Sequence, residues 1–129
     1  MSAGGKIIEY QLPGDWTILV GGSAGDNDYL STELAEPDDW WFHVDGVPGA
    51  HVLLRARPDQ EPARETLEQA AAVAAYHSKA RSAGTVPVHC TRARYVSKAR
   101  GADAGTVEVA RGKTLKVRPD VSFAVRPRL

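Results

Sequence analysis

Cysteine and long apolar runs are both scarce in this sequence of 129 residues. Cys90 is the only cysteine, so the chain can form no internal disulfide and no zinc site built from several thiolates. The longest apolar run, residues 70–76, is mostly alanine and is too short to cross a bilayer. The N-terminus lacks the apolar core of a signal peptide. We therefore expect a cytoplasmic protein.

An excess of either charge is also absent, because sixteen basic and sixteen acidic residues cancel. A neutral total disfavours a nucleic-acid-binding protein, since such proteins usually carry a basic excess. The charges are nevertheless divided unevenly along the chain. Residues 1–75 contain four Lys and Arg against thirteen Asp and Glu, a net charge of −9, whereas residues 76–129 contain twelve against three, a net charge of +9. This asymmetry indicates an anionic partner, unless folding interleaves the two halves.

The length and composition predict one globular domain over residues 1–129, with 43% hydrophobic and 25% charged residues. Residues 7–12 and 16–20 are rich in strand-forming side chains and flank a Pro-Gly-Asp turn, so they predict a hairpin. Residues 40–44 and 51–56 predict two further strands. The sequence contains no internal repeat, linker or low-complexity tract.

Two helices are expected. Asp26 or Asn27 can cap a short helix over about residues 27–35. A long Ala-rich helix is expected over about residues 62–83, where Pro62 suits the first helical position and small side chains form one face. The fold class is therefore α+β, a single domain with a mixed or antiparallel sheet.

The C-terminal part of the chain alternates with a period of two, which is typical of strands. An extended segment over residues 92–100 would carry a basic stripe along one face. Residues 107–109 and 115–117 predict a second hairpin across Arg111-Gly112, with Lys113 near the turn and Lys116 facing outward. The basic stripe suits either phosphate binding or a charged edge strand protected from aggregation.

Motifs for catalysis or metal binding are weak. The Gly-Lys-Thr at residues 112–114 lacks the first glycine of a phosphate-binding loop. The histidines do not have the helical spacing of a zinc protease. Cys90 directly follows His89 on a predicted strand, so the two side chains point to opposite faces and cannot pair as nucleophile and base. We therefore expect no catalytic residue, no metal and no cofactor.

Several short motifs follow one another over about residues 16–119. They are ILVG at 18–21, NDYLS at 27–31, DWWFH at 39–43, PGAHV at 48–52, YHSKAR at 76–81, VPV at 86–88, VSK at 96–98, GTV at 105–107 and KTLKV at 113–117. Together they resemble the NFACT-R domain, the presumed RNA-binding module of ribosome-quality-control factors that tail stalled nascent chains. This module is also found alone. Two positions depart from the family pattern: Gly22 stands where Arg or Lys is usual, and Ala50 replaces a serine. Weaker or altered binding through this face is therefore expected.

The resemblance and the basic C-terminal half together predict a non-enzymatic RNA-binding domain for tRNA or ribosomal RNA, in translation, ribosome quality control or RNA modification. Phosphate contacts are expected from eight basic residues: Lys79, Arg81, Arg92, Arg94, Lys98, Arg100, Lys113 and Lys116. The resemblance implies a polar cluster that either lines a selective pocket or fixes the turns: Asn27, Asp39, Trp41, His43, His51 and Ser78.

Two other functions are compatible with the sequence. An RNA-modifying or hydrolytic enzyme would use His43, His51 and Asp39, with or without a recruited metal. A protein-interaction adaptor on the ribosome would dock its −9 region on a basic protein while its +9 region contacts RNA.

Overall fold

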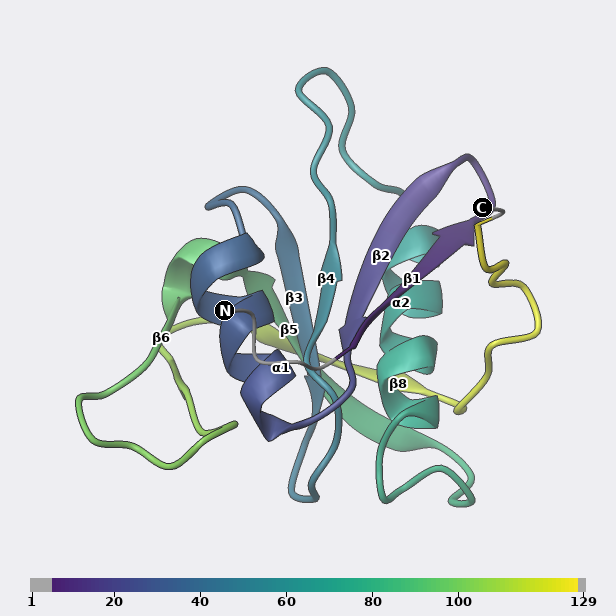
Figure 1. Ribbon diagram of the computed structural model, residues 1–129. Helices are drawn as coiled ribbons and strands as arrows, with labels where there is room; N and C mark the ends of the chain where they lie inside the picture. The colour runs from purple at the N-terminus through teal and green to yellow at the C-terminus, as the bar shows by residue number, and fades with distance from the viewer. Residues whose placement is uncertain (1–5, 128–129) are drawn as a thin grey trace.

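A six-stranded antiparallel sheet forms the centre of the molecule in the computed structural model, which describes residues 6–127. The strand order is β1-β2-β4-β3-β5-β8 (Figure 1). The bounds are β1 (Ile7–Leu12), β2 (Trp16–Gly21), β3 (Trp40–Val44), β4 (Val52–Leu54), β5 (Val86–Arg92) and β8 (Lys113–Val117). The expected α+β class, the first hairpin and the two middle strands are confirmed.

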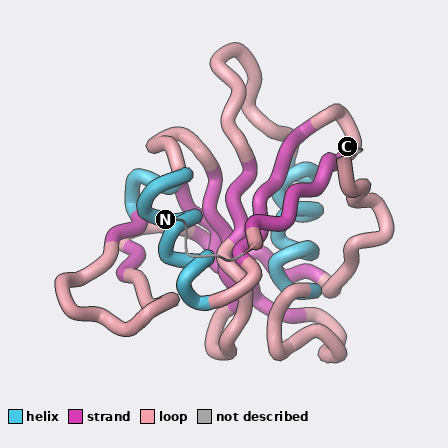
Figure 2. Tube along the Cα trace, in the orientation of Figure 1, coloured by secondary structure: helices cyan, strands magenta, loops and turns pink. Residues whose placement is uncertain are grey.

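The two faces of the sheet are covered by different helical layers (Figures 1 and 2). The helix α2 (Arg64–Tyr76) packs on one face. The other face carries α1 (Ala24–Tyr29), which continues into the π-helical turn η1 (Leu30–Leu34). The short strands β6 (Val96–Ser97) and β7 (Glu108–Val109) pair beside η1, after the 3₁₀ turn η2 (Ala93–Tyr95).

The main core lies between the sheet and α2. Alternate residues of each strand point to this side, among them Ile18, Phe42 and Val88, which are fully buried. They meet the alanine face of α2, whose small side chains let the helix lie close to the sheet. A smaller core on the opposite face is formed by five residues: Leu19, Leu30, Trp41, Leu53 and Ala93.

The Ala-rich helix is shorter than the sequence predicts, since it spans Arg64–Tyr76 rather than residues 62–83. The chain leaves the helix at His77, and Ser78 forms a β-bridge with Gly49. The Ser78 hydroxyl donates to the carbonyl of Ala75 and accepts from the backbone N–H of Ala80. Tertiary pairing and this local turn therefore override the helical propensity of residues 77–83. No helix among residues 6–127 is both long and apolar enough to span a membrane.

The first helical segment begins earlier than expected. Ser23 is the N-cap of α1, and its hydroxyl accepts from the backbone N–H of Asp26. The predicted range of 27–35 therefore covers only the end of α1 and the π-helical turn that follows it.

The expected second hairpin and the expected basic stripe are both wrong. The strand β8 pairs with β5, and β7 pairs with β6, so residues 107–109 and 115–117 belong to different sheets. Leu115 and Val117 thereby join the main core instead of packing on a small hairpin. The chain does not run on as one extended segment after Arg92, because residues 93–95 form the turn η2. There the backbone N–H of Ala93 bonds to the carbonyl of Asp39, and Ala93 is buried in the smaller core.

Candidate nucleic-acid interface

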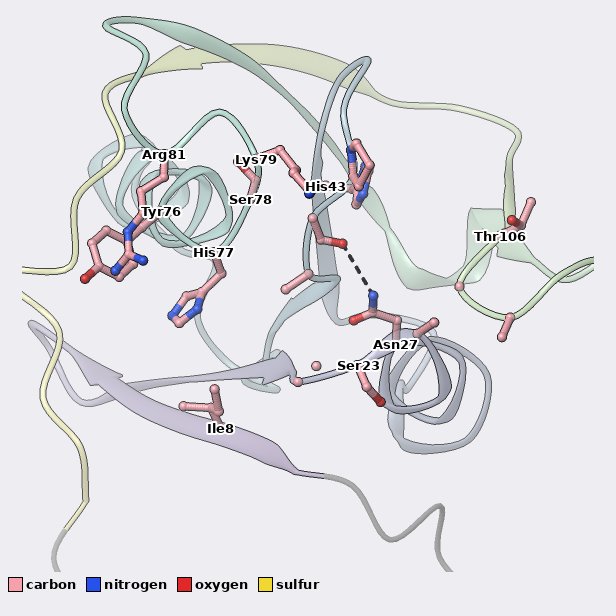
Figure 3. A pocket seen from close by; sticks show the side chains of 18 residues that line it. Ile8, Ser23, Asn27, His43, Tyr76, His77, Ser78, Lys79, Arg81 and Thr106 are labelled. Atoms are coloured by element: carbon pink, nitrogen blue, oxygen red, sulfur yellow. Dashed lines mark hydrogen bonds between the residues drawn. The ribbon is translucent and has the colours of Figure 1, made fainter.

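An open cleft of about 870 Å³ lies where four loops meet at one end of the sheet (Figure 3). It is lined by residues 21–24 at the start of α1, by 48–50 before β4, by 76–81 after α2 and by 104–106 in the loop before β7. Ile8 on β1, Asn27 on α1 and His43 on β3 complete the lining. Segments far apart in the sequence thus build one recess, of a volume typical of ligand-binding sites.

Close backbone approach at two glycines holds this recess together. A Cβ atom on Gly21 would lie 2.1 Å from Oδ1 of Asn27, and one on Gly49 would lie 2.7 Å from Cβ of Ser78. Both approaches are too tight for any side chain. The glycines of the ILVG and PGAHV motifs therefore let α1 and the loop after α2 converge on the cleft.

The charge of the cleft is positive. Lys79 and Arg81 line it, and none of its lining residues is Asp or Glu. The Arg81 guanidinium lies 3.8 Å from the ring centroid of Tyr76, an arrangement that fixes the cation beside an aromatic face. Two of the eight basic residues predicted from the sequence are therefore brought together here, with an aromatic ring that the sequence analysis did not single out.

His77 adds a neutral polar group to the same wall. Its Nε2 lies 3.0 Å from the hydroxyl of Tyr10 on β1. Burial, together with the positive charges of Arg81 and Arg126, lowers the pKa of His77 below its usual value. His77 is thus a hydrogen-bonding residue at neutral pH rather than a third cation.

Asn27 ties two loops of the cleft together. Its Oδ1 accepts from the backbone N–H of His51 at 3.0 Å, and its Nδ2 donates to the carbonyl of Gly49 at 3.4 Å, the bond drawn in Figure 3. The amide is buried, so these bonds replace water and fix the PGAHV segment against α1. Asn27 is thereby both a lining residue and a structural one.

A buried chain of hydrogen bonds lies behind the cleft. The indole N–H of Trp41 donates to Oγ of Ser31 at 2.9 Å, and Oγ of Ser31 lies 2.7 Å from Nδ1 of His51. Burial and the neighbouring His43 lower the pKa of His51 to about 4, so the ring is neutral. Trp41 and His51 are almost fully buried, and Trp41 therefore does not offer its ring to a base.

His43 lies between the cleft and this buried chain. Its ring stacks on Trp41 at a centroid distance of 6.1 Å and meets the edge of His51 at 5.3 Å. Burial is the main cause that lowers the pKa of His43. Its ring also lines the cleft, so His43 is the member of the aromatic group that remains accessible.

Asp39 lies away from the histidines. Its buried carboxylate accepts from Arg55 and from the backbone N–H groups of Glu36 and Ala56, all within 2.9 Å. Four residues of extended chain, about 13 Å, separate it from His43. The constellation needed for the enzymatic alternative is therefore not assembled. Within residues 6–127, no group of three or more His, Cys, Asp or Glu side chains could hold a metal ion.

Lys98 is engaged inside the protein. Its ammonium group donates to the carbonyls of Asp103 and Thr106 and lies 3.3 Å from the Asp28 carboxylate. The same carboxylate accepts from the backbone N–H of Gly105. Two of its three donors thus bond to carbonyls, and its charge pairs with the carboxylate. Lys98 thus fastens the loop over residues 98–107 to α1.

Three of the basic residues that were predicted to contact phosphate lie near the other end of β3. The Arg92 guanidinium lies 4.0 Å from the ring centroid of Trp40 and pairs with Glu61, Arg94 pairs with Asp38, and Nζ of Lys113 lies 5.8 Å from the same ring centroid. Arg100 and Lys116 are exposed. The eight basic residues therefore do not lie along one strand.

Folding interleaves the two oppositely charged halves of the sequence. The pairs Arg92–Glu61, Arg94–Asp38 and Lys98–Asp28 each join a cation of the second half to an acid of the first. These pairs neutralise three of the twelve cations of the second half, whereas Lys79 and Arg81 lie in a recess whose lining contains no carboxylate.

Comparison with known proteins assigns the chain to a family. The model of the NFACT protein RNA binding domain matches residues 6–111. The Rqc2 homolog RqcH of Bacillus subtilis is 39% identical over 117 residues, which cover 91% of this chain and 20% of that protein. The Rqc2 homolog RqcH of Streptococcus suis is 38% identical and is matched over 88% of this chain and 22% of its own length. This chain thus spans about a fifth of each of these relatives.

A solved structure shares the fold. It is the C-terminal part of the fibronectin/fibrinogen-binding protein from Streptococcus suis, with a TM-score of 0.82 at 35% identity, covering 89% of this chain and 46% of that one. The order of motifs read from the sequence is thereby accounted for by common ancestry. This chain belongs to the NFACT protein RNA binding domain family.

Proposed function

We propose that this domain binds an unpaired segment of tRNA or ribosomal RNA in the cleft, without catalysing a reaction, as part of ribosome quality control. The observation that carries the proposal is that Lys79 and Arg81 both line a recess whose lining contains no carboxylate. Membership of an RNA binding domain family and similarity to Rqc2 homologues support it.

The chemistry of the cleft suits a sugar-phosphate backbone. Lys79 supplies a point charge, and Arg81, which lies over the ring of Tyr76, supplies a fork of N–H donors that matches phosphate oxygens. Tyr76 and His77 add ring faces, which bind unpaired nucleotides more readily than a duplex.

The cations around Trp40 are weaker candidates. Arg92 and Arg94 already pair with Glu61 and Asp38, so a phosphate would have to displace a carboxylate from each. We propose that these residues, together with Arg100, Lys113 and Lys116, contribute only to the longer-range attraction of RNA.

Filter binding to total tRNA and to a ribosomal RNA fragment over a range of salt concentrations tests the proposal. Lys79→Ala combined with Arg81→Ala should weaken binding and reduce the slope of log K against log salt by about 1.4–1.8, since each lost phosphate contact contributes about 0.7–0.9. Arg92→Ala combined with Arg94→Ala is the control, because it removes the same charge. If the control pair weakens binding and the cleft pair does not, the interface lies around Trp40 and the proposal is wrong.

A further inference from the structure

A second, smaller pocket adjoins the cleft on the face of the sheet opposite α2. Its volume is about 360 Å³, and it shares His43, Gly105 and Thr106 with the cleft. Its other lining residues are Trp41, Asp45, His51, His89, Val107 and Val109. A molecule lying in the cleft can therefore place one of its groups in this pocket.

The walls of this pocket suit a flat ring. Val107 and Val109 form an apolar side, and the rings of His43 and His89 come from directly paired positions on β3 and β5. Paired residues of antiparallel strands project from the same face, with Cβ atoms about 5 Å apart. Because burial lowers the pKa of His43, its ring is neutral and can stack on a base.

Asp45 supplies the one charge of this pocket. It follows β3 two residues after His43, and its backbone N–H bonds to the carbonyl of Pro87, so the strand pairing continues and the two side chains share a face. Two residues of strand span about 6.6 Å, roughly the width of a base. Asp45 is the single carboxylate lining either the cleft or the pocket, and within residues 6–127 its side-chain oxygens take part in no hydrogen bond or ion pair.

We propose that the pocket holds one unpaired guanine of the bound RNA, with its Watson–Crick edge on Asp45; this inference rests on the proposed function. An ionised carboxylate only accepts hydrogen bonds. Guanine presents a ring N–H and an amino group side by side on that edge, and both can donate to the two oxygens. Adenine and cytosine present one amino group beside a ring nitrogen acceptor, and uracil presents one N–H between two carbonyls. Asp45 therefore discriminates for guanine and most strongly against uracil.

Four RNA pentamers, UUGUU, UUAUU, UUCUU and UUUUU, test the base preference by fluorescence anisotropy. UUGUU should bind about tenfold more tightly than UUUUU, the discrimination typical of one bidentate pair. Asp45→Asn should reduce this ratio to below about twofold. The ratio is the readout, because removing a negative charge also strengthens phosphate binding to every pentamer. Asp59→Asn removes an exposed carboxylate outside both linings and should leave the ratio unchanged.

The failure of this inference can be told from failure of the proposed function. Equal affinity for all four pentamers, lost on combining Lys79→Ala with Arg81→Ala, would leave RNA binding in the cleft intact and refute the guanine pocket. Absence of binding to every pentamer and to tRNA would refute both. Ring signals of His43 and His89 in NMR spectra of the unaltered protein provide a second readout. They should shift with UUGUU and much less with UUUUU, and equal shifts would contradict the inference.

Discussion

The hydroxyl oxygen of Ser31 lies 2.7 Å from Nδ1 of His51 and 2.9 Å from the indole nitrogen of Trp41, so one buried oxygen links the two rings. The Trp41 indole can only donate, so Oγ of Ser31 is its acceptor and the serine proton is free to point at His51. When the serine donates to Nδ1, the neutral His51 ring carries its own proton on Nε2. One buried hydroxyl thus joins Trp41 to His51, immediately before β4 and behind the cleft.

Replacement of Ser31 by alanine should destabilise the protein by about 2 kcal/mol or more. It would leave the Trp41 N–H and Nδ1 of His51 without partners in a buried site. Urea unfolding measures the difference. Thr32→Ala is the matched control, because that hydroxyl is exposed, and it should change stability by less than about 0.5 kcal/mol. A similar loss of unfolding free energy in both variants would contradict the buried chain of hydrogen bonds from Trp41 through Ser31 to His51.

The His51 ring should stay unprotonated down to about pH 5, because burial and His43 lower its pKa to about 4. The unfolded chain has a histidine pKa near 6.5 and takes up the proton first, so the contribution of His51 to stability is full above about pH 6.5 and is lost as the pH falls toward 4. The loss amounts to about 3 kcal/mol in total. An NMR titration of the ring protons measures the pKa of His51 in the folded protein directly. A midpoint near pH 6.5 would contradict the buried, neutral ring.

Replacement of Lys98 by methionine should loosen the loop over residues 98–107. Lys98 and the Gly105 N–H both bind the Asp28 carboxylate, and bonds to charged groups contribute about 1.5 kcal/mol or more. Amide hydrogen exchange at Gly105 should therefore accelerate by about tenfold. The exposed Arg100 offers a control, because Arg100→Met removes the same charge from the same loop without this anchor. Equal acceleration in both variants would mean that charge alone matters.

A methyl group at Gly21 should be costly, whereas one at Gly84 should not. The Cβ atom at position 21 would meet Oδ1 of Asn27 at 2.1 Å and displace the amide that holds the His51 backbone. Gly21→Ala should lower the free energy of unfolding by about 1–3 kcal/mol. At Gly84 no atom lies within 4 Å, so Gly84→Ala should be neutral or slightly stabilising. Comparable unfolding midpoints for the two variants would contradict the close approach of α1.

The parts of the fold that follow from local pattern were predictable. The hairpin of β1 and β2 follows from strand-forming residues on both sides of a Pro-Gly-Asp turn. The family motifs pointed to Asn27, His43 and Ser78, which do line the cleft. The pairing of β8 with β5 was not predictable, because Leu115 and Val117 fit either a hairpin or the main sheet until the open edge of β5 is known. Long-range pairing decided their place.

The candidate site was harder to predict for the same reason. Tyr76 and His77 were visible beside Ser78 and Lys79, but only the end of α2 after Tyr76 turns them toward the cleft. The charge count along the sequence overestimates the basic surface, because acidic residues of the first half pair with Arg92, Arg94 and Lys98 in the fold.

Photo-crosslinking of 4-thiouridine-labelled tRNA, followed by mass spectrometry of the protein peptides, tests the cleft most directly. If RNA lies in the cleft, the crosslinked peptides will contain residues 76–81 or 104–106, and combining Lys79→Ala with Arg81→Ala will abolish these crosslinks. Crosslinks confined to the segments around Trp40, residues 92–94 and 113–116, that persist in the double variant would contradict the account.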